Sequence, residues 1–205
     1  YSWGSYDTHP YILLNYHNNL HNVFTIAHEM GHALHSYFSN KNQPYIYAGY
    51  RIFVAEVAST VNEVLLTDYL LKKSQNDRER MYLINYYLEQ FRGTVYRQTM
   101  FAEFEKIIHA KVENGEPLTP EVLKEIYYNL NKVYYGPDIV IDKEIAVEWA
   151  RIPHFYHAFY VYKYATGFAA AVAISQKILN KEPGAVERYI NFLSSGSRDY
   201  PINLL

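Results

Sequence analysis

The sequence predicts a mainly α fold with one short β-strand near its start. Glycine contributes 9 and proline 8 of the 205 residues, a share of roughly 8% where about 12% is usual, so few residues interrupt helices. Apolar residues recur every three to four positions over long stretches, which is the spacing of helices with one buried face. Hydrophobic residues at 49% and charged residues at 20% are typical of a folded globular domain.

The first third of the chain is expected to hold the strand and two helices. Residues 10–16 form a β-prone run after a turn, which predicts a single strand at an edge. After an Asn-rich turn, helical spacing of apolar residues predicts a helix over residues 20–38. Residues 39–49 are polar and contain a Gln-Pro pair, which predicts a loop. The next periodic segment predicts a helix over residues 50–73.

The remainder of the chain is expected to be helical. Residues 77–113 form one very long periodic segment, and a bend in it is expected at Gly93. Thr119 followed by Pro120 predicts a helix start, because threonine caps free N–H groups and proline fits the first helical position. That helix should end near residue 134, before a Gly-Pro pair. Three further helices are expected, over residues 142–152, 153–180 and 183–194.

Charge and cysteine content exclude several classes of function. A net charge of -2 gives no electrostatic basis for binding nucleic acid or an anionic membrane. The chain has no cysteine, so it has no thiolate nucleophile, and any metal must be bound by histidine and carboxylate side chains. No repeat and no low-complexity linker divides the sequence. We therefore expect a single domain over residues 1–205.

His28, Glu29 and His32 form an H-E-x-x-H pattern inside the first predicted helix. Residues four apart on a helix are separated by about 40° in projection, so both imidazoles point the same way and can share one Zn²⁺. Glu29 lies about 100° from His28, beside the metal position instead of on it. It is then placed to take a proton from a water that the metal activates.

The second predicted helix offers the third ligand that a zinc site needs. Glu56 lies in the apolar stretch IFVAEVAST, where a buried carboxylate requires a charge partner, either a metal or an Arg or Lys. Glu63 lies seven residues later, about 20° away in projection, and could accept the free N–H of a ligating histidine or form a structural ion pair. His35 is a rival ligand, but three histidines along one straight helix span about 10 Å, too far for one metal.

The order of three motifs resembles oligoendopeptidase F and, more distantly, thimet oligopeptidase and its relatives. The motifs are HEMGH at 28–32, FVAEVASTVNE at 53–63 and RIPHFY at 151–156, and the resemblance extends to the final residues, DYPINLL at 199–205. It implies a zincin-like helical catalytic lobe that binds one Zn²⁺ per chain through His28, His32 and Glu56. It also implies that the strand at residues 10–16 borders the substrate cleft.

The same resemblance implies an enzyme and its partners. We expect a cytoplasmic zinc endopeptidase that cleaves internal bonds of short peptides, with no nucleic-acid or membrane partner. The larger N-terminal helical part of such enzymes, and their extreme C-terminus, are expected to lie outside these 205 residues. The single domain predicted above is then the catalytic one.

The third motif is expected to hold the substrate. The resemblance places a histidine and tyrosines here to bind the substrate and the oxyanion of the tetrahedral intermediate, and these roles fall on His154 and Tyr164. His157 and Tyr160 are candidates for substrate binding or for packing alone. In one helix running through this segment, His154, His157 and Tyr164 share a side and Tyr162 faces away.

Two alternative functions remain open at this point. A zinc carboxypeptidase or dipeptidyl carboxypeptidase would need a cation to bind the free carboxylate of its substrate, and Arg92, Arg97 and Arg151 are available. An inactive peptide-binding module is the other alternative. The presence of Glu29 argues against it, because a module without catalysis has no use for the base.

Overall fold

The computed structural model describes residues 1–205 as two compact units. The first unit comprises residues 1–87 and 166–205, and the second comprises residues 88–165. The boundaries fall inside two helices, α4 (Asp77–Phe91) and α7 (Tyr162–Leu179). Helical periodicity continues across both boundaries, which is why the sequence shows no linker. A single catalytic domain over residues 1–205 stays a prediction.

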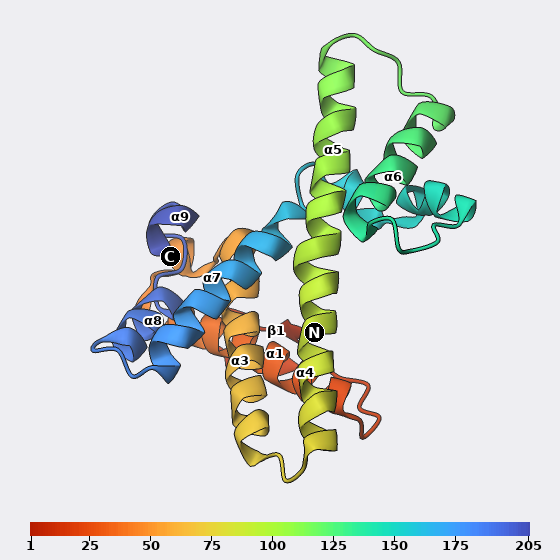
Figure 1. The fold of residues 1–205 in the computed structure, drawn as a ribbon. Helices are drawn as coiled ribbons and strands as arrows, with labels where there is room; N and C mark the ends of the chain where they lie inside the picture. The colour runs from red at the N-terminus through yellow and green to blue at the C-terminus, as the bar shows by residue number, and fades with distance from the viewer. The chain divides into compact units, whose positions relative to one another are not determined.

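The predicted fold class is confirmed: Figure 1 shows a chain of helices with one small sheet near the N-terminus. Strand β1 (Ser2–Trp3) pairs antiparallel with β2 (Tyr11–Ile12). The single strand predicted over residues 10–16 is therefore wrong in length, and its partner β1 was not predicted. Two residues on each side give too little alternation for a sequence pattern to detect. None of the helices combines the length and apolar character needed to cross a membrane.

The first unit is built around two long helices that pack against each other, α1 (Leu20–Asn42) and α3 (Ile52–Lys73). The short helix α2 (Tyr45–Ala48) lies between them in the chain, where a loop was predicted over residues 39–49. That prediction is wrong: residues 39–42 continue α1 and residues 45–48 form α2, and side-chain hydrogen bonds hold this segment in place. Ser39 Oγ donates to the Ala48 carbonyl, and Gln43 Nε2 donates to the Ser194 carbonyl at 2.8 Å.

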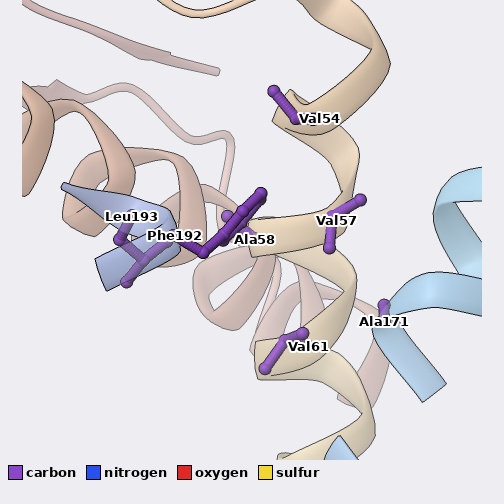
Figure 2. Close-up of a cluster of buried hydrophobic side chains, with 7 residues drawn as sticks. All are labelled: Val54, Val57, Ala58, Val61, Ala171, Phe192 and Leu193. Carbon is purple, nitrogen blue, oxygen red and sulfur yellow. The ribbon is translucent and has the colours of Figure 1, made fainter. Parts of the chain in front are cut away.

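The core of the first unit gathers on α3 (Figure 2). Helix α8 (Ala185–Leu193) follows Gly184, whose φ of 74° is the left-handed conformation that glycine adopts readily. The prediction of a helix over residues 183–194 is confirmed within two residues, and the short α9 (Pro201–Leu204) follows it. Figure 2 shows the buried side chains from α3, α7 and α8, namely Val54, Val57, Ala58, Val61, Ala171, Phe192 and Leu193.

The second unit contains the continuation of the long helical segment and the third motif. A π-helical turn, Arg92–Tyr96, includes Gly93 and joins α4 to α5 (Arg97–Glu113). Helix α6 (Pro120–Tyr135) begins as predicted, because the Thr119 side chain accepts the Val122 N–H. Seven side chains form its core: Met100, Phe101, Phe104, Tyr127, Leu130, Ile152 and Val161.

Of the two helices predicted between residues 142 and 180, one is confirmed in place and one is wrong. The short helix predicted over residues 142–152 is present at Lys143–Arg151, as a 3₁₀ helix. The helix predicted over residues 153–180 is broken: a 3₁₀ turn covers Pro153–Tyr156, and α7 begins only at Tyr162. Between them Phe159 has a φ of 56°, which no right-handed helix contains.

Candidate functional site

Helices α1 and α3 pack closely enough for their motif residues to meet. A Cβ atom added to Gly31 would lie 2.5 Å from the Ser59 Cα atom, so only glycine fits there without a shift of backbone. Asn62 Nδ2 on α3 also donates to the Ala27 carbonyl on α1, at 3.0 Å. The glycine inside the H-E-x-x-H segment therefore brings the two helices into contact at the level of the histidines.

The structure brings His28, His32 and Glu56 together. The two imidazole Nε2 atoms are 3.2 Å apart, and Glu56 Oε2 lies 3.5 Å from His28 Nε2 and 3.8 Å from His32 Nε2. Ligand atoms on a tetrahedral zinc with bonds of about 2.0–2.1 Å are about 3.3 Å apart, so the spacing fits that metal. Two imidazoles with one carboxylate are also a donor set that zinc enzymes use.

Glu63 fixes the orientation of the first histidine. His28 Nδ1 donates to Glu63 Oε1 at 2.7 Å, which leaves the Nε2 lone pair facing Glu56. Burial opposes the charged imidazolium, but the bond to Glu63 and the nearby carboxylates outweigh it and raise the pKa of His28. Burial lowers the pKa of His32, against the attraction of Glu56 and with the repulsion of His28.

Two further polar side chains of the first two motifs, Ser59 and Glu29, bear on the same group. Ser59 is fully buried, and its Oγ donates to Glu56 Oε2 at 3.0 Å, which fixes that carboxylate. The side chain of Glu29 is 13% exposed, and Glu29 is not part of the group formed by His28, His32 and Glu56. Its charge nevertheless favours the protonated forms of both His28 and His32. This position suits a base beside a metal better than a ligand.

His35 lies on α1 one turn after His32, is buried, and is not part of the candidate ligand group. Its ring stacks on Tyr50 with 3.6 Å between centroids, and burial lowers the pKa of His35 to about 3. The Tyr50 hydroxyl hydrogen-bonds Ser36 Oγ at 2.8 Å and reaches the His32 carbonyl at 3.4 Å. Tyr50 is thus a supporting residue that no motif predicts, because it is one of 23 tyrosines in the sequence.

In the second unit, His154 of the third motif forms a cluster with two tyrosines that follow it in the chain. The Tyr164 hydroxyl lies 3.1 Å from His154 Nε2, and the Tyr160 ring lies 5.3 Å from the His154 ring and 5.8 Å from the Tyr164 ring. His157 is exposed; its backbone N–H donates to the His154 carbonyl at 3.0 Å, but its imidazole lies outside this group of three rings. The helical phase that grouped it with them is wrong, because the helix is broken at residues 157–161.

Comparison with known proteins places the whole chain in one family. The model of peptidase family M3 matches residues 1–205. Oligopeptidase PepF of Bacillus subtilis is 60% identical over 205 residues, and group B oligopeptidase PepB of Streptococcus agalactiae is 50% identical over the same length. These matches cover 100% of this chain but only 31% and 34% of those proteins. The chain therefore spans about a third of the length of the curated relatives it matches.

Solved structures agree with this assignment. A crystal structure from Chlamydophila abortus matches with a TM-score of 0.90 and 50% identity, covering 100% of this chain and 34% of that one. Oligoendopeptidase-F from Enterococcus faecium matches with a TM-score of 0.80 and 50% identity, covering 90% of this chain and 33% of that one. Sequence and fold lead to the same conclusion: the chain belongs to peptidase family M3.

Proposed function

We propose that these 205 residues hold the zinc centre and the general base of a zinc-dependent endopeptidase that cleaves internal bonds of short oligopeptides. The observation that carries the proposal is the group formed by His28, His32 and Glu56, whose ligand atoms lie within 4.8 Å of one another. One Zn²⁺ per chain would be bound there. When bound, the zinc would polarise the scissile carbonyl and lower the pKa of water from 15.7 to about 7.

The side chains around the group have distinct tasks in this reaction. Glu29 takes the proton of the attacking water and later delivers it to the leaving amine. Glu63 keeps His28 in the tautomer whose Nε2 lone pair is free, at a hydrogen-bond distance of 2.7 Å. Ser59 keeps the Glu56 carboxylate turned toward the histidines.

The cluster in the second unit is proposed to bind the substrate. Tyr164 donates its O–H to the developing oxyanion, and His154, 3.1 Å from that hydroxyl, orients it or donates as well. Tyr160 supplies an aromatic surface beside His154, and the exposed His157 contacts the peptide farther out. The relatives' names, oligopeptidase and oligoendopeptidase, support a peptide substrate.

The ion pairs of Arg92, Arg97 and Arg151 favour endopeptidase action over the carboxypeptidase alternative. Arg97 and Arg151 both contact Glu148 Oε1, at 2.6 and 2.5 Å. Arg92 pairs with Glu89 at 2.6 Å. A substrate carboxylate would have to compete with an ion pair that each arginine already makes.

The test is metal analysis of the full-length protein followed by mass spectrometry of its products from a mixed peptide pool. One zinc per chain and cleavage at internal bonds are expected. Removal of residues from the C-terminus alone would assign the carboxypeptidase alternative. Peptide binding without cleavage by the zinc-loaded protein would assign the inactive module.

A further inference from the structure

A buried carboxylate in the second unit holds the backbone between His154 and Tyr164. Glu105 on α5 is 2% exposed, and its Oε1 accepts a hydrogen bond of 2.7 Å from the Phe159 backbone N–H. A buried carboxylate is costly unless hydrogen bonds compensate it. This bond ties the middle of residues 157–161 to α5.

Phe159 is the point in that segment where such a tie is needed. Its φ of 56° is in the left-handed region, which a bulky residue enters only under strain. A strained backbone conformation persists only where several surrounding contacts hold it in place. Here Ile152 and Val161, on either side, are buried in the core of the unit, and the His109 ring, one turn beyond Glu105, lies 4.6 Å from the Phe159 ring.

We propose that Glu105 is a positioning residue for the His154–Tyr164 pair. By fixing Phe159, it sets the path of the chain from the 3₁₀ turn at Pro153–Tyr156 to the start of α7. That path leaves the Tyr164 hydroxyl 3.1 Å from His154 Nε2. The effect on catalysis rests on the proposed function, whereas the effect on the backbone does not.

Two variants of the full-length protein separate hydrogen bonding from packing. Glu105→Gln keeps a side-chain oxygen at the same reach, and Glu105→Met fills the same space without an acceptor. The matched control is Glu103→Met, on the same helix but exposed and bonded to the Tyr134 hydroxyl at 2.7 Å. Because small misplacements of catalytic groups lower turnover by up to about 10²-fold, Glu105→Met should lower kcat about 10- to 100-fold with little change in KM. Glu105→Gln and the control should stay near the parent.

Hydrogen exchange of the Phe159 amide, followed by mass spectrometry with fragmentation, is the second readout. Protection is expected in the parent and in Glu105→Gln, and at least tenfold faster exchange in Glu105→Met, with α5 amides unchanged. If Glu105→Met does not fold, Glu105→Asp shortens the reach by one methylene and tests the same bond.

Equal damage from Glu105→Gln and Glu105→Met, or Phe159 exchange that does not respond to loss of the acceptor, would overturn the proposal. A full-length protein that cleaves no peptide would contradict the proposed function alone. The exchange measurement would still decide whether Glu105 positions the turn.

Discussion

Replacing Gly31 by alanine tests the link between helix packing and the metal site. The new Cβ atom would lie 2.5 Å from Ser59 Cα, 2.6 Å from the Ala58 oxygen and 2.8 Å from the Ala58 carbonyl carbon. All three are backbone atoms, so no side-chain rotation relieves the clash. Reaching an ordinary contact of 3.4 Å from 2.5 Å requires a shift of about 0.9 Å between α1 and α3.

That shift has two measurable costs. Overpacking of this kind costs about 1–3 kcal/mol, more than the roughly 0.5–1 kcal/mol that alanine gains over glycine within a helix. The histidines lie on α1 and Glu56 lies on α3, so the same shift moves the carboxylate away from them. A zinc–oxygen bond of about 2.0–2.2 Å does not stretch by that amount, and zinc affinity should fall at least tenfold.

Scanning calorimetry and competition with a chelator measure the two effects in the full-length protein. Gly167→Ala is the matched control, because its Cβ would lie 3.7 Å from the Glu56 Cβ, an ordinary contact with the same ligand residue. The control should keep its zinc, and its thermal midpoint should stay the same or rise slightly, because alanine is favoured over glycine inside a helix such as α7. A Gly31→Ala protein as stable and as tight for zinc as the parent would refute the close approach of the two helices.

Three further substitutions test the assigned roles. Glu29→Gln keeps the side-chain shape but removes the proton acceptor, so turnover should collapse while zinc content stays near one per chain. Loss of zinc from this variant would show instead that Glu29 is a ligand. Glu56→Ala should weaken zinc binding in a chelator titration, and unchanged affinity would transfer the third-ligand role elsewhere. Tyr164→Phe should lower kcat by about 10² with little change in KM, with Tyr162→Phe nearly silent, and the reverse result would reassign the oxyanion donor.

Helices could be predicted from sequence where apolar residues recur at helical spacing over a long stretch and a capping residue marks the start. For α6 the start is fixed by Thr119, whose side chain accepts the Val122 N–H, and the end by Gly136, whose φ is 76°. Both signals are local. The spacing of His28 and His32 is local in the same sense, because one helical turn brings the imidazoles together whatever the rest of the fold does.

The break in the third motif could not be predicted, because its cause is distant in sequence. The turn at Phe159 is tied to Glu105, 54 residues earlier, and nothing between His154 and Tyr164 contains a glycine that would signal a left-handed residue. In one continuous helix these two residues would share a side but lie about 15 Å apart along the axis. Their contact therefore depends on the break.

Hydropathy also misjudged which carboxylates are buried. Glu56, in an apolar stretch, was expected to be buried, yet its side chain is 22% exposed. Glu105 lies in the charged stretch AEFEKIIHA and is 2% exposed. The difference is helical phase: Glu105 is four residues after the buried Phe101, on the same face of α5, so it enters the core of its unit. The burial of a carboxylate is therefore set by the helix face it occupies and not by its neighbours in sequence.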